Sequence, residues 1–383
     1  MNERMTTKER LLAAWRCQEV DYVPMAWHFW NSPLHAKATW HNERQRLEFY
    51  RRRSWDARVE VETAVTPLAK VRTDVRYETD RGRPVLHQVW HTPAGSVSER
   101  LRVTEDWPPR DRDDNGPIGF RDDFRTSRYV DFPFKSEADL ATLPYLFPLD
   151  NANDTERLIN QHREARILAD EFCVPLICYH PAGMDWLIWL YPAEEAIIRA
   201  QTEPDVISAL LNHINRAYFG QLQLMLHLGV DGVCRRGWYE SADLWSPSLF
   251  VKFARGPLEQ DIRACHSAGG VFIYLMDSGV VPLLGELARL GFDCLFGVDP
   301  ATSPVDLRQI RQALPGKSLW GGISGPLHIG RGTASDAEHA VERAFEACGR
   351  SDFVLGPGVG IRYNWPWENV EAVERAWCRL RFA

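Results

Sequence analysis

The sequence predicts an α/β protein, a parallel (β/α)8 barrel with a β-hairpin region inserted in its N-terminal half. Two observations carry this prediction. From residue 173 onward, short apolar runs alternate with longer helical patterns, which is typical of parallel strands joined by helices. The apolar runs at 318–322 and 352–355 also end in glycine-rich turns, and an α/β barrel places its chemistry at such strand ends.

The N-terminal part of the chain predicts two helices and the first two strands. Residues 6–17 begin with a Thr-x-x-Glu capping box and continue with an apolar face, so they predict a helix. Residues 23–29 form a short extended run that predicts the first strand, and the highly charged residues 41–54 predict a solvated helix. Residues 59–65 alternate with a period of two, which predicts a second strand whose glutamates share one face.

The pattern changes between about 70 and 135. Residues 77–92 and 95–104 alternate and contain turn residues, which indicates antiparallel hairpins. We expect a β-rich insertion at 70–135, placed between barrel strands or lying as a flap over the barrel mouth. Residues 106–128 are rich in Asp, Arg, Pro and Gly, so we expect an exposed loop with solvated charges.

Strands and helices alternate in the rest of the chain. Helices are expected at 152–170, 192–200, 203–227, 246–268, 280–290, 303–313, 334–348 and 366–380, and strands at 173–179, 230–234, 270–275, 293–297, 318–322 and 352–355. With the N-terminal strands the number approaches eight, which favours a closed barrel and a single domain over residues 1–383. No Gly-x-Gly-x-x-Gly follows a strand, so dinucleotide binding is disfavoured.

Composition excludes several classes of partner. The net charge of -7 is spread over interspersed charges without a basic stripe, so we expect no nucleic acid partner. No apolar run approaches the ~20 residues needed to span a membrane, and the N-terminus lacks the apolar core of a signal peptide. Eight scattered cysteines without Cys-x-x-Cys indicate reduced thiols and a cytoplasmic protein. The sequence leaves a homodimer open.

Several segments share their order and spacing with a known superfamily. They are Gly-Gly-Ile-Ser-Gly-Pro at 321–326, the glycine-rich turn at 355–361, Gly-Met-Asp-Trp at 183–186 and Ser-Pro-Ser-Leu-Phe at 246–250. Together with the opening helix and strand, they resemble the uroporphyrinogen decarboxylase-like superfamily. That superfamily contains porphyrinogen decarboxylases and zinc-dependent methyltransferases that act with corrinoid proteins. The resemblance covers most of the chain and implies the barrel fold.

The chain departs from the methyltransferase branch at the zinc ligands. That branch normally presents His-x-Cys at one strand end and a further Cys at a later strand end. Here Tyr274 and Met276 take the first two positions and Val359 takes the third. Met and Val cannot replace thiolates as zinc ligands. We therefore expect no metal site among these residues.

The chain also departs from the decarboxylase branch. The arginine-rich loop after the first strand is replaced by residues 27–31, which contain no arginine, so the site does not suit a polycarboxylate porphyrinogen. The resemblance places Glu62 within one residue of the family's central Asp. It places Tyr191 where the decarboxylases have a substrate-facing Tyr, and Ser241 where they have a Ser. The decarboxylase His position coincides with Val359.

Four residues are candidate catalytic groups: Glu62, His28, Tyr191 and Asp277. Glu62 is a candidate general acid or base, and the alternative is a surface glutamate paired with Arg58 or Lys70. His28 is a candidate ligand, base or hydrogen-bond donor, and the alternative is a core histidine with its partners satisfied. Asp277 follows a buried strand, and the alternative is a helix cap. We expect Glu62 and His28 to line one pocket.

A further set of aromatic, polar and charged residues lies near predicted strand ends and would bind the substrate. Its members are Trp27, Trp30, Trp238, Tyr239, Ser241, Arg235, Tyr274 and Arg362. Either Arg235 or Arg236 would clamp a substrate carboxylate or phosphate. Aromatic walls suit a flat aryl ether, or an onium methyl donor through cation–π contacts.

Three functional hypotheses follow. The first is a small-molecule methyltransferase that uses acid–base groups in place of zinc. It would bind no cofactor tightly and would use a corrinoid protein or another methyl carrier as co-substrate. The second is a decarboxylase or other lyase acting on a small apolar carboxylic acid, with Glu62, Tyr191 and Ser241 near the reacting carbon. The third is a ligand-binding barrel that has lost its chemistry.

Overall fold

The structure of the protein, a computed structural model, describes residues 4–28, 40–105, 107, 118–121, 123–302, 305–358, 360–362 and 364–382. The chain divides into two compact units. The first consists of Met1–Thr63, Arg157–His180 and Leu222–Ala383, and the second of Ala64–Glu156 and Pro181–Gln221. None of the helices in the described parts is long and apolar enough to cross a membrane.

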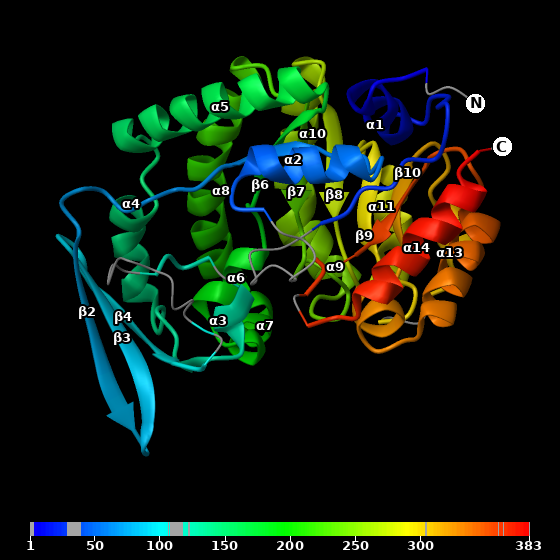
Figure 1. The fold of residues 1–383 in the computed structure, drawn as a ribbon. Helices are drawn as coiled ribbons and strands as arrows, with labels where there is room; N and C mark the ends of the chain where they lie inside the picture. Colours follow the sequence, from blue (N-terminus) through cyan, green and yellow to red (C-terminus); the bar gives the residue numbers. More distant parts are fainter. Residues whose placement is uncertain are drawn as a thin grey trace. The chain divides into compact units, whose positions relative to one another are not determined.

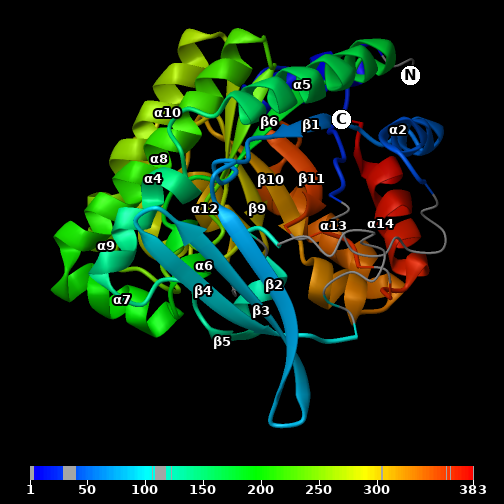
Figure 2. The same cartoon turned by 90° about the vertical axis from the view of Figure 1, so that its left-hand side faces the viewer.

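The first unit is built on a seven-stranded sheet in which every pair of neighbouring strands is parallel (Figure 2). The strands follow the order of the sequence: β1 (Val59–Glu62), β6 (Leu176–His180), β7 (Gly232–Arg236), β8 (Val271–Leu275), β9 (Cys294–Val298), β10 (Ser318–Ile323) and β11 (Phe353–Pro357). The α/β fold with a parallel sheet is therefore confirmed. The strands lie within a few residues of their predicted positions.

Within the described residues 23–28, the predicted first strand is reduced to a single bridge. Met25 bridges Leu355 of β11 in parallel, and the N–H of Ala26 donates to the carbonyl of Leu355 over 3.0 Å. Pro24 has no N–H to donate, and the N–H of Met25 donates to the carboxylate of Asp56 over 3.1 Å. Because the backbone nitrogens of Pro24 and Met25 do not donate to a neighbouring strand, a regular ladder does not form.

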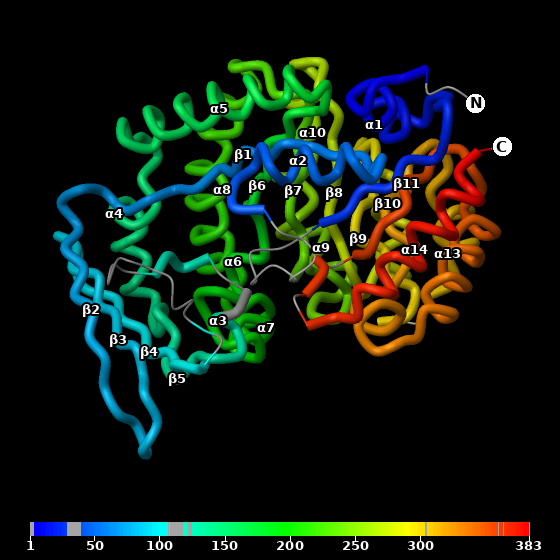
Figure 3. Tube along the Cα trace, in the orientation of Figure 1, coloured from blue at the N-terminus to red at the C-terminus, as the bar shows by residue number. Residues whose placement is uncertain are grey.

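The helices of the first unit are mostly those that the sequence predicts. They are α1 (Thr7–Trp15), α2 (Glu43–Arg52), α9 (Pro247–Phe250), η2 (Val251–Arg255), α10 (Gly256–Ser267), η3 (Val281–Leu283), α11 (Leu284–Arg289), α12 (Leu307–Ala313), η4 (Gly325–Gly330), α13 (Ala334–Cys348) and α14 (Trp367–Leu380). The helix α5 (Ala152–Phe172) and the helix α8 (Pro204–His227) have residues in both units. Figures 1 and 3 show α13 and α14 side by side.

One predicted helix is interrupted. The segment 246–268 forms α9, a π-helical turn at Val251–Arg255, and α10. Pro257 lies two residues after this turn, and it has no N–H for the bond that would continue the α-helix. The wider turn accommodates the missing donor.

One face of the parallel sheet, called the inner face below, carries the main apolar cluster. Alternate residues of the strands contribute to it, as the period of two requires: Ile177, Tyr179, Cys234, Val271, Ile273, Leu275, Cys294, Phe296, Trp320 and Val354. The helix α1 adds Leu11, Ala14 and Trp15 to the same cluster.

The helix α1 packs at the amino-terminal ends of the strands. The N–H of Lys8 donates to the carbonyl of Cys173, just before β6, and the guanidinium of Arg16 donates to the carbonyl of Gly269, just before β8. The Thr6–Glu9 capping box that the sequence predicts is present at the start of α1. Because α1 covers the amino-terminal ends, functional side chains are expected at the carboxyl ends.

The second unit contains a four-stranded antiparallel sheet in the order β2 (Arg72–Asp80), β3 (Arg83–Thr92), β4 (Gly95–Arg102) and β5 (Tyr129–Asp131). Its helices are α3 (Asp123–Thr126), η1 (Glu137–Thr142), α4 (Leu143–Leu146), α6 (Asp185–Leu190) and α7 (Ala193–Thr202). The predicted hairpins are confirmed, and Arg81 and Gly82 form the first turn with positive φ angles of 50° and 77°. That this sheet covers a barrel mouth stays a prediction.

The prediction of a solvated loop at 106–128 is wrong for the described part of that segment. Trp107 and Arg125 are buried, and the guanidinium of Arg125 pairs with the buried carboxylate of Glu99. Gln88 donates to the same carboxylate over 2.6 Å. The charged composition of this segment therefore does not reveal that Arg125 forms a buried ion pair.

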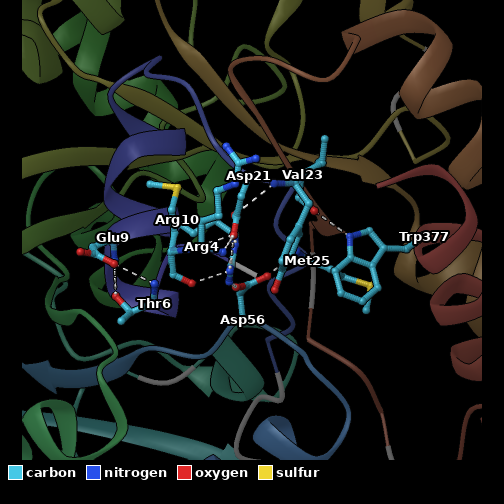
Figure 4. Close-up of polar contacts among 11 residues, drawn as sticks. Arg4, Thr6, Glu9, Arg10, Asp21, Val23, Met25, Asp56 and Trp377 are labelled. Atoms are coloured by element: carbon cyan, nitrogen blue, oxygen red, sulfur yellow. Dashed lines mark hydrogen bonds and ion pairs between the residues drawn. The ribbon is translucent and has the colours of Figure 1, made fainter. Parts of the chain in front are cut away.

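A buried arginine joins α1 to the segment that follows it (Figure 4). The guanidinium of Arg10 donates to Asp21 over 2.6 Å and to Asp56 over 2.8 Å, and its charge lies 3.7 Å from the ring centre of Tyr22. Burial alone would raise the pKa of Asp21, but hydrogen bonds from Arg10 and from two backbone N–H groups lower that pKa to about 2. Asp56 in turn accepts the N–H of Met25.

Replacing Arg10 with Met is expected to lower the free energy of unfolding by about 3–5 kcal/mol, because Asp56 would remain buried without its cation. The control is Arg44→Met, which removes an exposed ion pair with Glu171 and should lower the free energy of unfolding far less, because solvent screens that pair. Chemical and thermal unfolding of the intact chain measure both losses. Equal losses for the two variants would contradict the role of Arg10.

Candidate active site

Charged side chains of β1 lie on the inner face of the sheet. The register pairs Glu60 with Ile177 and Glu62 with Tyr179, and both partners belong to the inner-face cluster. Because paired residues of neighbouring strands point to the same side, both glutamates face inward. Glu62 lies at the carboxyl end of β1 and is half-buried. Arg58 pairs with Glu60 over 2.6 Å, so the predicted alternative of a Glu62–Arg58 pair is not what the structure shows.

Arg58, Glu60 and His28 form a connected group. A nitrogen of the Arg58 guanidinium lies 2.9 Å from Nδ1 of His28, and the guanidinium stands 4.5 Å from the ring centre of Trp320. Burial alone would raise the pKa of Glu60, but the charge and the hydrogen bond of Arg58, together with neighbouring charges that include Arg46, outweigh burial and lower that pKa. The Glu60 side chain is 29% exposed, so solvent reaches this group.

The contact with Arg58 fixes the tautomer of His28. A guanidinium can only donate, so Nδ1 of His28 accepts and the proton of the neutral ring is on Nε2. Burial lowers the pKa of His28 to about 4, against the opposing charge of Glu60 and with the help of Arg58. His28 is therefore neutral at physiological pH. Of the three roles considered for it, the structure favours hydrogen-bond donor.

The end of β7 adds a second arginine to the inner face. Arg236 is buried and in register with Leu275 of the inner-face cluster. Its guanidinium lies 5.6 Å from the ring centre of Trp238 and 5.5 Å from that of Tyr239. Trp238 also packs against the inner-face cluster. The sequence leaves Arg235 and Arg236 open as the substrate clamp, and the geometry favours Arg236.

Arg235 points to the opposite face and holds a buried network. It donates to Asp261 of α10 over 3.1 Å and to Glu240 over 3.3 Å. The hydroxyl of Tyr274 donates to the other oxygen of Glu240 over 2.5 Å, and His180 lies 3.6 Å from Asp261. The predicted substrate residues Arg235 and Tyr274 therefore anchor the loop after β7 and do not lie on the inner face.

Asp277 and Asp299 follow the neighbouring strands β8 and β9. Both are buried, and burial raises the pKa of Asp277 to about 7, with further contributions from the charges of Asp299 and Asp243. One oxygen of Asp299 accepts the N–H groups of Ala301 and Thr302, each over 2.9 Å. Among the described residues, Oδ1 of Asp277 and Oδ2 of Asp299 have no hydrogen-bond partner.

Asp277 and Asp299 are called the acid pair below. The chain that follows β11 passes close to them. A Cβ atom on Gly358 would lie 2.2 Å from the carbonyl oxygen of Gly297 and 2.5 Å from Oδ1 of Asp277. Only glycine allows this approach. The N–H of Ile361, three residues later, donates to the carbonyl of His28 over 3.0 Å. The segment after β11 therefore contacts both Asp277 and the backbone of His28.

Other predicted site residues lie in different surroundings. Ser241 is buried in the loop after β7, and the next residue donates its N–H to the carbonyl of Gly279, which joins this loop to the one carrying Asp277. Trp27 packs on Trp55, with ring centres 5.3 Å apart. Arg362 is half-buried and follows the residue that contacts His28. Trp30 lies outside the described residues.

Tyr191 belongs to the second unit. It is buried, its ring centre lies 6.1 Å from that of Phe134, and the guanidinium of Arg199 lies 5.4 Å from it. Burial raises the pKa of its hydroxyl to about 12. Its catalytic role stays a prediction.

Sequence reasoning missed Glu60, Arg58 as an inner-face residue, and Asp299. A signal for Asp299 was present, because it directly follows a buried strand, and Asp277 likewise lies two residues after one. Glu60 shares the face of Glu62 by the period of two. Arg58 gave no signal, because its stacking on Trp320 joins residues far apart in the sequence.

The residues at the zinc positions of the methyltransferase branch do not fit a zinc ion. Met276 is fully buried, and the hydroxyl of Tyr274 is bound to Glu240 on the opposite face. Val359 lies outside the described residues. In the part of the chain that the structure describes, no three His, Cys, Asp or Glu side chains are grouped to hold a metal.

Comparisons with solved structures found similar proteins. A methyltransferase from Methanosarcina mazei aligns over 98% of this chain and 99% of its own, with a TM-score of 0.65 and 19% sequence identity. A B12-independent methionine synthase from a Shewanella species aligns over 93% of this chain and 96% of its own, with a TM-score of 0.47 and 12% identity. No curated protein is significantly similar in sequence.

The family model described as uroporphyrinogen decarboxylase matches residues 124–378. This range contains the strands β6 to β11 and both members of the acid pair. The resemblance seen in the sequence motifs is thereby confirmed, and the chain belongs to the uroporphyrinogen decarboxylase family of enzymes.

Proposed function

We propose that this protein is a cytoplasmic small-molecule methyltransferase in which Asp277 is the general acid. The observation that carries the proposal is the acid pair, because a carboxyl with a pKa of about 7 still holds its proton near neutral pH. The fold shared with the Methanosarcina methyltransferase over nearly the whole chain is the reason for choosing methyl transfer.

The proposal includes a closed barrel with its site at the carboxyl ends of the strands. The Met25–Leu355 bridge and the hydrogen bond from the N–H of Asp56 to the carbonyl of Met25 over 3.0 Å support closure. In a closed barrel, the ends of all strands share one mouth. His28, Glu62, Arg236 and Asp277 would then face one substrate.

The proposed step breaks the bond between a methyl group and an oxygen of the substrate. A methyl acceptor, supplied by a corrinoid protein or another carrier, provides the electron pair for the new bond to the methyl carbon. The leaving oxygen keeps the electrons of the broken bond and takes the proton of Asp277, which becomes a carboxylate. Solvent then returns a proton to Asp277. Proton donation by a placed acid contributes about 10²–10⁴-fold to such a rate.

The aromatic surroundings favour an aryl ether over an onium methyl donor. Trp320 stacks on Phe296 with ring centres 3.8 Å apart, and Arg58 lies against the same indole. The rings of Trp238 and Tyr239 are within 6 Å of the Arg236 charge. A second cation near these rings would be repelled, whereas a neutral ring or one with a carboxylate would be tolerated.

Decarboxylation of a small apolar acid is the second candidate. Arg236 on the inner face would hold a carboxylate, and Asp277 would protonate the carbon that loses carbon dioxide. The same residues therefore serve either reaction, and the products distinguish the two.

The direct test incubates the purified protein with methoxylated aromatic acids, with and without a reduced corrinoid carrier. Mass spectrometry follows the phenol product, and a second assay measures carbon dioxide. Carrier-dependent phenol formation supports the proposal. Release of carbon dioxide would favour the second candidate, and the absence of both products would favour a binding protein.

The pH dependence of Asp277 provides a test that needs no substrate. A carboxyl whose pKa rises from 3.8 to about 7 on folding contributes stability that is complete below about 3.8 and lost as the pH rises through 7. Asp277→Asn should therefore raise Tm relative to the wild type more at pH 8 than at pH 5. The exposed Asp170→Asn is the control. A difference that does not change with pH would contradict the raised pKa.

Once a substrate is found, Asp277→Asn should also remove the decline of kcat above about pH 7, because the general acid must be protonated to act. A wild-type rate that rises through pH 7, or a variant that keeps the same profile, would exclude Asp277 as the acid.

Glu62→Gln should lower the rate by about 10²–10⁴-fold if Glu62 exchanges a proton with the substrate, with little change in Tm. The change keeps the size and hydrogen-bonding capacity of the side chain. Glu259→Gln, on the helix α10, is the matched control and should leave the rate unchanged. A loss of stability in place of activity would make Glu62 a structural residue.

A further inference from the structure

The four-stranded sheet of the second unit ends on one side in a long, regular edge strand. β2 has nine residues, and among the described strands it pairs with β3 alone (Figure 2). Its register against β3 runs without a shift from Arg72 to Asp80, and its sequence contains no proline. Proteins commonly protect edge strands from pairing with proline, with a bulge or by keeping them short, and β2 has none of these devices.

The turn after β2 determines which of its backbone groups point away from the sheet. Arg81 and Gly82 form a two-residue turn, so Asp80 and Arg83 on either side of it are a hydrogen-bonded pair. Because hydrogen-bonded and non-hydrogen-bonded pairs alternate, the outward N–H and C=O groups belong to Thr73, Val75, Tyr77 and Thr79. Within the described part of the chain, these groups accept and donate no hydrogen bond.

The residues between them carry alternating charges on one face of β2. They are Arg72, Asp74, Arg76 and Glu78. Within the strand, Arg72 lies 3.2 Å from Asp74. Arg76 likewise lies 2.6 Å from Glu78. Both arginines are mostly exposed, so solvent screens these pairs, and an opposite strand would give each charge a second partner.

This order of charges is complementary to itself in one antiparallel register. With Val75 opposite Val75 of a second copy, all four charges have a partner of opposite sign, since Arg72 faces Glu78 and Asp74 faces Arg76. Moving the centre of pairing by one residue would instead place Asp74 opposite Asp74 or Arg76 opposite Arg76. The charged residues form the non-hydrogen-bonded pairs of this register, whose side chains lie closest together.

We infer that β2 is an interaction surface for a second copy of this chain, which pairs with it antiparallel about a two-fold axis at Val75. The pairing joins two four-stranded sheets into one and forms about six backbone hydrogen bonds between the outward groups. A second copy is the chosen partner because β2 itself carries the complementary charges. The inference concerns the second unit and does not depend on the proposed methyl transfer.

Analytical ultracentrifugation of the full chain at about 1–100 µM tests the inference. The wild type should form a dimer with a Kd in the micromolar range, because an interface of one strand pair is small. Arg72→Glu places two glutamates opposite each other, and Glu78→Arg places two arginines opposite each other, so each should raise the Kd about tenfold or more. Arg263→Glu, at an exposed arginine of α10, makes the same change of charge and should leave the Kd unchanged.

Mixing the two variants identifies the register. A heterodimer of Arg72→Glu with Glu78→Arg has opposite charges at both ends of the strand pair, so the equal mixture should regain the wild-type Kd. Native mass spectrometry should show one copy of each variant in that dimer. Damage to the fold of either variant would not be repaired by mixing, and thermal unfolding of each checks that fold.

A proline variant tests the backbone pairing. Tyr77 is 58% exposed, so Tyr77→Pro removes an outward N–H with little loss of packing and should also raise the Kd about tenfold or more. Tyr77→Thr keeps the N–H and should dimerise as the wild type does. A wild type that stays monomeric up to about 100 µM, no recovery in the mixture, or an unchanged Kd for Tyr77→Pro would overturn the inference.

Discussion

The arrangement of the inner face depends on the buried contact of Arg10 with Asp56. Asp56 accepts a charged hydrogen bond from Arg10 and a second one from the N–H of Met25, so a single carboxylate fixes two segments of the chain. His28 lies three residues after Met25, and Arg58 lies two residues after Asp56. The contact between His28 and Arg58 is therefore a consequence of how their segments are held. Buried ion pairs of this kind contribute little net stability but are costly to break.

Strand geometry gives neighbouring residues different tasks. Arg235 and Arg236 are adjacent in β7, yet one anchors α10 and the loop after β7 whereas the other faces the aromatic side chains of the inner face. The network on the helix side positions the loop that carries Trp238 and Tyr239. Because successive side chains of a strand point to opposite faces, the residues that anchor the loop and the residues proposed to bind substrate lie on opposite sides of the sheet.

Much of this fold could be predicted from the sequence, because buried parallel strands and their helices leave strong periodic patterns. Asp277 was found because it follows such a strand. The orientation of Tyr274 could not be predicted, since it depends on Glu240, which lies 34 positions away in the sequence. The orientation of Arg235 could not be predicted for a related reason: a shift of one residue along a strand reverses the face. The buried Arg125 was hidden in a segment whose composition is typical of loops.

Gly358 has a consequence for how this enzyme tolerates mutation. It provides no functional group, yet any side chain there would collide with the carbonyl of Gly297 and with the carboxyl of Asp277. In a library of random variants, position 358 would behave like an active-site residue, although it takes no part in proton transfer. Glycine is required at position 358 because the carboxyl of Asp277 occupies the space that a side chain would need. Gly358 therefore limits which side chains the acid pair can have, although Gly358 itself has no functional group.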